Sequence, residues 1–122
     1  MSWTPFLILA AIVAVVLMMK KAGQISAADA LAYLKNGALV IDVRSAGEFS
    51  AGHLANAINI PLDEIEIALP KRVKDKNQVL LLHCASGMRS GMAKGKLKSM
   101  GFTNAFNLGS YGRAESILKQ AR

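Results

Sequence analysis

The sequence divides sharply by charge, and this division limits the possible folds more than any other feature. Residues 1–19 contain no charged side chain, and all 15 Lys/Arg and all 8 Asp/Glu residues lie at or after Lys20. A chain with 52% hydrophobic residues arranged in this way is not a disordered protein, a collagen-like repeat or a polytopic membrane protein. Its 122 residues leave room for one ordinary domain after the apolar segment.

The apolar segment allows three interpretations. Residues 6–19 are uninterruptedly apolar, and a bilayer core needs about 20 apolar residues, with a range of about 17–25. A secretory signal peptide would carry basic residues before this run, although cleavage at Ser26-Ala27-Ala28 stays open. A buried core helix would leave apolar faces uncovered. We therefore expect residues 1–19 to form a transmembrane anchor that contacts membrane lipid, and we keep the other two as alternatives.

The charges after this segment predict its orientation. Lys20 and Lys21 follow the apolar run directly, and no cation precedes it. By the positive-inside rule, the following domain faces the cytoplasm. We expect a single-pass membrane localisation, a short basic linker over residues 20–24 and one domain over residues 25–122.

Apolar periodicity in the body alternates between helical and strand-like. Helices are expected from Ser26 to about residue 35, over 62–69, over 88–100 and over 112–121, and strands over 38–41, 57–60, 79–82 and 105–108. Strands that alternate with helices indicate an α/β domain with a mainly parallel sheet.

The chemistry is expected where strand 79–82 ends. Ligands of open α/β sheets bind beyond the carboxyl ends of the strands, and Cys84 lies there, just before a helix. Helix N-termini stabilise anions and lower the pKa of a cysteine thiol. Gly87 permits a backbone turn that points N–H groups inward, and Arg89 adds a cation. The alternative interpretation is a buried structural cysteine. A single cysteine excludes an intramolecular disulfide, and with only two histidines a structural zinc site is not expected.

The loop also resembles a known family. Cys84-Ala85-Ser86-Gly87-Met88-Arg89-Ser90 is similar to the active-site loop of single-domain rhodaneses. Further similar segments are Ile41-Asp42-Val43-Arg44, Glu48-Phe49, Gly52-His53-Leu54, Ala57-x-Asn59-Ile60-Pro61, Gly101-Phe102 and Asn107-Leu108-Gly109. The resemblance covers about residues 25–112. It implies a rhodanese-like α/β fold with a five-stranded parallel sheet flanked by helices.

The resemblance implies a sulfurtransferase. Cys84 would take a sulfane sulfur from a donor such as thiosulfate, hold it as a persulfide and pass it to cyanide, a thiol or a protein acceptor. Ala85, Ser86, Gly87, Met88 and Arg89 would bind the substrate, and Asp42, Arg44 and Ser90 would support the site. No cofactor or metal is implied. With 6% aromatic residues and no recognition motif, nothing indicates nucleic-acid binding.

Two other function classes stay open. Cysteine phosphatases and arsenate reductases use a related loop with one more residue between cysteine and arginine than the four found here. A non-enzymatic docking or sensor module is the other alternative, but the presence of Cys84, Gly87 and Arg89 argues against it. The sequence departs from the family after Gly109, where Ser110-Tyr111-Gly112 replaces the usual second glycine and tryptophan, which affects how the final helix packs.

The remaining polar residues of the motifs are expected to be structural. Asp42 and Arg44 would tie down the next loop by hydrogen bonds or through Glu48. His53 would satisfy backbone groups, and His83 would point away from the face of Cys84. Because glycines destabilise a helix, Gly91 and Gly95 predict a close neighbour for helix 88–100.

Overall fold

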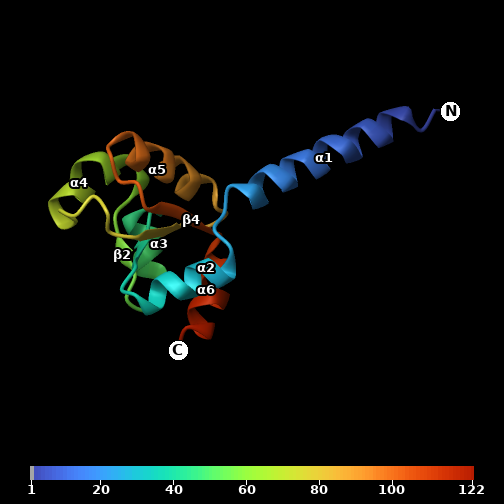
Figure 1. The fold of residues 1–122 in the computed structure, drawn as a ribbon. Helices are drawn as coiled ribbons and strands as arrows, with labels where there is room; N and C mark the ends of the chain where they lie inside the picture. The colour runs from blue at the N-terminus through green and yellow to red at the C-terminus, as the bar shows by residue number, and fades with distance from the viewer. Residues whose placement is uncertain (1) are drawn as a thin grey trace.

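A computed structural model describes residues 2–122, with side chains described for residues 2–18 and 23–122. In chain order the elements are α1 (Thr4–Ala22), α2 (Ala27–Lys35), β1 (Leu39–Asp42), α3 (Ala46–Ala51), β2 (Ile58–Asn59), the 3-10 helix η1 (Leu62–Glu64), α4 (Ile65–Arg72), β3 (Leu80–His83), α5 (Met88–Ser99), β4 (Ala105–Gly109) and α6 (Tyr111–Gln120). Figure 1 shows α1 extending away from the body, in which the other helices pack around one sheet.

The sheet has four strands in the order β2-β1-β3-β4, and every neighbouring pair is parallel. The predicted α/β class with a parallel sheet is therefore confirmed, but the prediction of five strands is wrong. Where a fifth strand would lie, Gln24 forms one isolated parallel bridge with Asn107. The hydroxyl of Ser26 then accepts a hydrogen bond from the N–H of Asp29 (3.1 Å) and starts α2. The chain thus enters a helix before a strand can extend.

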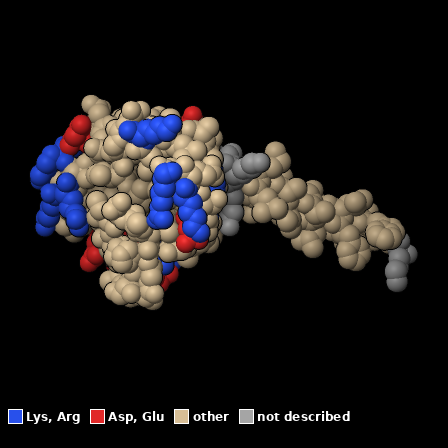
Figure 2. Space-filling model, turned by 90° about the horizontal axis from the view of Figure 1, so that it is seen from below, with Lys and Arg blue, Asp and Glu red and all other residues tan. Residues whose placement is uncertain are grey.

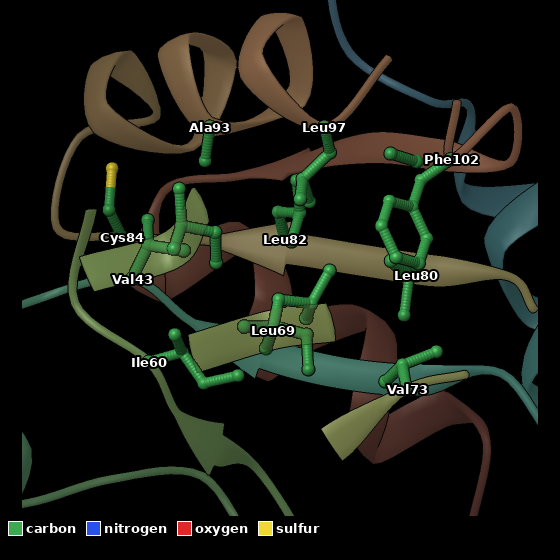
Figure 3. Close-up of a cluster of buried hydrophobic side chains, with 13 residues drawn as sticks. Val43, Ile60, Leu69, Val73, Leu80, Leu82, Cys84, Ala93, Leu97 and Phe102 are labelled. Carbon is green, nitrogen blue, oxygen red and sulfur yellow. The ribbon is translucent and has the colours of Figure 1, made fainter. Parts of the chain in front are cut away.

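Helices cover both faces of the sheet. One face packs against α4 and α5 in a cluster that includes Leu80, Leu82 and Cys84, and the other packs against α2 and α6 around Leu81 and Leu108. Successive strand side chains point to opposite faces, so β3 at the centre of the sheet buries all of its side chains. Figure 3 shows Cys84 at the margin of the first cluster, with its sulfur directed towards the side on which α5 lies.

The apolar N-terminal segment does form a helix, but its predicted role is not supported. Within the described part of the chain, none of the helices combines the length and the apolar character that crossing a bilayer requires. The predicted single-pass membrane localisation, with its transmembrane anchor and cytoplasmic orientation, is therefore wrong, and a lipid partner has no support. The physical reason is length: the charge-free part of α1, residues 4–19, rises about 24 Å, less than the hydrocarbon core of about 30 Å.

The side chains of α1 also exclude the core-helix alternative. Those of residues 2–18 are exposed, and Figure 2 shows that the described part of α1 carries neither Lys/Arg nor Asp/Glu, whereas charged side chains lie on the body. Lys20 and Lys21, on which the predicted orientation rested, lie outside the residues whose side chains are described. The chain of α1 continues as a helix to Ala22, into the segment expected as a linker.

Candidate active site

Cys84 lies between the end of β3 and the start of α5, where the sequence placed it. Gly87 is the N-cap of α5 and has a φ of 95°, in the left-handed region that favours glycine. This conformation turns the N–H of Gly87 towards Cys84, and it donates a hydrogen bond to the Cys84 Sγ atom (3.0 Å). The loop thus presents backbone N–H groups to the sulfur, as expected for a site that holds an anion.

The surroundings of Cys84 favour its thiolate. Burial of the side chain raises the pKa of the thiol, but hydrogen bonds from the Ser90 hydroxyl and from the backbone N–H groups of Ser90, Gly87 and Ser86 lower it. The hydrogen bonds outweigh burial, so the pKa of Cys84 lies below its ordinary value. The Sγ atom lies 3.5 Å from the Ser90 Oγ atom. The structure therefore brings Ser90, predicted as a supporting residue, into contact with the sulfur.

Arg89 does not point freely into the loop. Its Nη1 atom donates to Oε1 of Glu48 (2.6 Å) and its Nη2 atom to Oε2 (2.9 Å), so that it forms a bidentate ion pair with α3. The hydrogen bond from Arg89, followed by that from the Ser45 backbone, lowers the pKa of Glu48 to about 2. The sequence analysis expected a cation available to the substrate, whereas the structure offsets this charge with a carboxylate. Glu48 was not predicted as a site residue.

Asp42 and Arg44 lie at the end of β1 and form a separate ion pair. The Asp42 carboxylate accepts hydrogen bonds from the backbone N–H of Arg44 (2.9 Å) and from its Nη2 atom (2.7 Å). Arg44 also donates to the carbonyl of Gly52 (2.8 Å) and lies over the ring of Tyr111, with its Cζ atom 4.8 Å from the ring centroid. These contacts tie down the loop after β1, and neither side chain contacts Cys84.

The two histidines lie away from the sulfur. His53 is exposed, its Nδ1 atom lies 2.9 Å from the carbonyl oxygen of Phe49, and its ring stacks on that of Phe49. His83 is fully buried, and its ring nitrogens have no hydrogen-bond partner within the described residues. Its Nε2 atom is 3.8 Å from Asp42 Oδ2, and burial lowers its pKa.

Asn107 on β4 is a second contributor that the sequence analysis did not single out. Its Nδ2 atom donates to the carbonyl of Gly87 (3.1 Å), and its Oδ1 atom accepts from the Ser90 hydroxyl (2.7 Å). Its position was a usable signal, because it lies near the carboxyl end of the strand that pairs with β3.

The two glycines of α5 differ from each other. A Cβ atom at Gly91 would lie 3.4 Å from Asn107 Nδ2, so the predicted close neighbour exists there. A Cβ atom at Gly95 would meet nothing within 4 Å among the described residues, so the prediction of a close neighbour at Gly95 is wrong.

The loop separates two hollows. One, of about 600 Å³, is lined by Ser86, Gly87, Met88 and Met92 with Lys94 and Lys98, and the other, of about 340 Å³, by Val43, Ser45, Pro61 and Arg89 among others. The Met88 side chain is 64% exposed, whereas Cys84 is fully buried beneath the loop. Among the described residues no three His, Cys, Asp or Glu side chains gather as metal ligands.

Comparisons with known proteins agree with this geometry. Residues 26–112 match the rhodanese-like domain family. The thiosulfate sulfurtransferase PspE of Escherichia coli K12 is 41% identical over 69 residues, which are 57% of this chain and 66% of PspE. A tRNA uridine(34) hydroxylase of Hamiltonella defensa is 35% identical over 75 residues, 58% of this chain and 21% of that enzyme. The chain thus spans just under two thirds of the first relative and about a fifth of the second.

Two solved structures share the fold. A rhodanese from E. coli, solved with anions, has a TM-score of 0.61 and 36% identity, over 63% of this chain and 91% of that one. The human single-domain sulfurtransferase TSTD1 has a TM-score of 0.63 and 28% identity, over 80% of this chain and 96% of that one.

Proposed function

Because the chain belongs to the rhodanese-like domain family, we propose that it is a sulfurtransferase that carries a sulfane sulfur atom on Cys84. The enzyme class predicted from the sequence is supported by the relatives, since PspE is named a thiosulfate sulfurtransferase and TSTD1 a single-domain sulfurtransferase. The domain expected over residues 25–122 would supply the whole site, and thiosulfate is the proposed donor.

The observation that carries the proposal is the hydrogen bond from Gly87 N–H to the Cys84 sulfur, at the N-terminus of α5. It stabilises a thiolate, which is the nucleophilic form. In the proposed first step this thiolate attacks the outer sulfur of thiosulfate. A bond forms between Sγ and that sulfur, the S–S bond of thiosulfate breaks, and its electron pair leaves with sulfite.

The second step returns Cys84 to its starting state. The terminal persulfide sulfur is anionic, and the N–H groups of Ser86, Gly87 and Ser90 would stabilise it as an oxyanion hole stabilises oxygen. Cyanide or a thiolate then attacks the terminal sulfur, and the Sγ–S bond breaks to release thiocyanate or a new persulfide with the Cys84 thiolate. Ala85, Ser86, Gly87, Met88 and Arg89 form the loop that would surround the transferred sulfur.

The same geometry weighs against a phosphatase or arsenate reductase. Such enzymes need an arginine that faces the bound oxyanion, and Arg89 is instead engaged by Glu48 through both of its terminal nitrogens. A docking or sensor module would not need a cysteine whose pKa is lowered by its loop.

Intact-mass spectrometry after incubation with thiosulfate tests the proposal. We expect a gain of about 32 Da, one sulfur atom, that disappears after addition of cyanide. The control is Cys84→Ser, which is nearly isosteric and leaves an oxygen to accept the Gly87 N–H, so it should fold but gain no mass. Thiocyanate production by Cys84→Ser, or an unchanged mass of the wild-type protein with every sulfane donor tried, would contradict the proposal.

A further inference from the structure

We propose that Asn107 is a positioning residue of the sulfur-binding loop: it holds Gly87 and Ser90 in the orientations in which both can hydrogen-bond to the Cys84 sulfur. This inference rests on the proposed function only for its consequence in sulfur transfer. Asn107 itself does not contact the sulfur through any described hydrogen bond, and it belongs to β4, on the far side of β3 from β1.

The Asn107 side chain is buried, with 6% exposure, and both of its polar atoms are engaged. Nδ2 donates to the Gly87 carbonyl at 3.1 Å, and Oδ1 accepts from the Ser90 hydroxyl at 2.7 Å and from the Gly109 N–H at 2.9 Å. The partners fix the orientation of this amide, because a backbone N–H can only donate and a backbone carbonyl can only accept. Asn107 therefore holds the loop in one defined way.

The contact with Gly87 fixes the donor to the sulfur. Gly87 donates its N–H to Sγ, while its carbonyl accepts from Asn107 Nδ2 and from Ser90 Oγ (3.1 Å each). With the peptide groups on both sides of Gly87 held, its φ and ψ angles are restrained at the left-handed value that aims the N–H at Cys84. Without the Asn107 amide, the carbonyl side would lose one of its two hydrogen bonds.

The contact with Ser90 concerns a single proton. The Ser90 hydroxyl has one proton and three acceptors around it: Asn107 Oδ1 at 2.7 Å, the Gly87 carbonyl at 3.1 Å and Cys84 Sγ at 3.5 Å. At these distances the proton lies towards Asn107, and the Ser90 oxygen accepts the S–H of a neutral thiol. When Cys84 ionises, the hydroxyl rotates and donates to the thiolate.

Asn107 makes this rotation possible without leaving a buried group unpaired. Its Oδ1 atom keeps the hydrogen bond from Gly109 N–H, and the Gly87 carbonyl keeps the one from Asn107 Nδ2. An unsatisfied buried polar group would cost about 1–3 kcal/mol, and the arrangement avoids this cost. Asn107 thus serves the thiolate and the persulfide through two neighbours.

The test compares the titration of Cys84 in Asn107→Ala and Asn59→Ala. Cys84 is the only cysteine, so the pH dependence of its alkylation, or of thiolate absorbance, reports this residue alone. Asn59 is a matched control, because its Nδ2 atom also donates two hydrogen bonds, to the Asp42 and Arg44 carbonyls (3.0 Å each), but away from the sulfur. Both variants are expected to melt at lower temperature.

Only Asn107→Ala should raise the pKa of Cys84, by about one unit, which is about tenfold less thiolate at neutral pH. If Asn107→Ala does not fold, Asn107→Ser replaces it, since a serine hydroxyl cannot reach both Gly87 and Ser90. A wild-type titration in the folded Asn107 variant, or an equal shift in Asn59→Ala, would overturn the proposal. The titration needs no sulfur donor, so it stands apart from failure of the wild-type protein to form a persulfide.

Discussion

Arg89 and Glu48 form a two-point ion pair that links the sulfur-binding loop to α3, with Nη–Oε distances of 2.6 and 2.9 Å. The two residues are 41 positions apart in the chain. Glu48 also accepts from the Ser45 N–H (3.2 Å), while Ser45 Oγ accepts from the Glu48 N–H, so one carboxylate closes the capping box of α3 and holds Arg89. The arginine of the loop is thereby anchored and largely neutralised before any substrate arrives.

Glu48→Gln should reveal this anchor through the pH dependence of stability. The folded-state pKa of Glu48 is about 2, below its ordinary value of 4.5. Its contribution to stability is therefore fully present above about pH 4.5 and is lost as the pH falls towards about 2. We expect the wild-type protein to melt at higher temperature than Glu48→Gln above pH 5 and the difference to shrink between pH 4.5 and 2. A difference that is constant down to pH 2 in thermal melts would contradict the ion pair.

Met88→Lys should increase the use of thiosulfate as donor. With Arg89 paired, the exposed Met88 side chain leaves the mouth of the loop without an unpaired cation among the described loop residues 84–90. An ammonium about 4 Å from an anion gains about 1 kcal/mol per unit charge in water, which is about fivefold in kcat/KM. The gain should fall with added salt. Met92→Lys, one turn further along α5 and 58% exposed, is the matched control. An equal gain in both variants would mean that only net charge matters.

Gly95→Ala should stabilise the protein, and Gly91→Ala should do so less or not at all. Alanine in a helix interior is favoured over glycine by about 1 kcal/mol, and no described atom lies within 4 Å of a Cβ atom at Gly95. At Gly91 the added Cβ atom would lie 3.4 Å from Asn107 Nδ2, in a part of α5 that cannot shift without moving the loop. Thermal denaturation of the two variants measures the difference. A lower melting temperature for Gly95→Ala than for Gly91→Ala would contradict the assignment.

Removal of His83 should flatten the loss of stability in mild acid. Burial holds the pKa of His83 below its ordinary value of 6.5. Above pH 6.5 the ring is neutral in both states, and below it the unfolded chain takes up a proton that the folded protein does not. Stability therefore falls from pH 6.5 down to the folded-state pKa. His83→Phe should lose this slope in denaturant titrations, while His53→Gln at the exposed histidine should keep it. The same slope in His83→Phe as in the wild-type protein would contradict the assignment.

Local pattern was enough to predict most of the body of the fold. The apolar run before Cys84, the capping serine at Ser26 and the helical spacing after residue 88 correspond to β3, α2 and α5. Each depends on neighbours within a few residues, which the sequence displays directly. The position of Cys84 at a strand end and a helix start follows from the same local signals.

Predictions failed where the outcome depended on distant parts of the chain. The resemblance implied a fifth strand, but the segment at Gln24 pairs with β4 at a single position before α2 begins. Gly91 and Gly95 look alike in sequence, and only the packing of α5 against Asn107 separates them. The apolar run of residues 6–19 indicated a membrane anchor, but the helix it forms is too short in its charge-free part to span a bilayer.

The sequence by itself determined the chemical groups and the local backbone of the loop: a cysteine before a glycine that tolerates a positive φ, at the start of a helix. Tertiary structure alone decided which side chains surround that loop. Glu48 comes from α3 and Asn107 from β4, 41 and 20 residues from their partners Arg89 and Gly87. The parallel sheet creates these contacts, because it gathers the carboxyl ends of β1, β3 and β4 at one edge, so that segments distant in the chain meet around one sulfur atom.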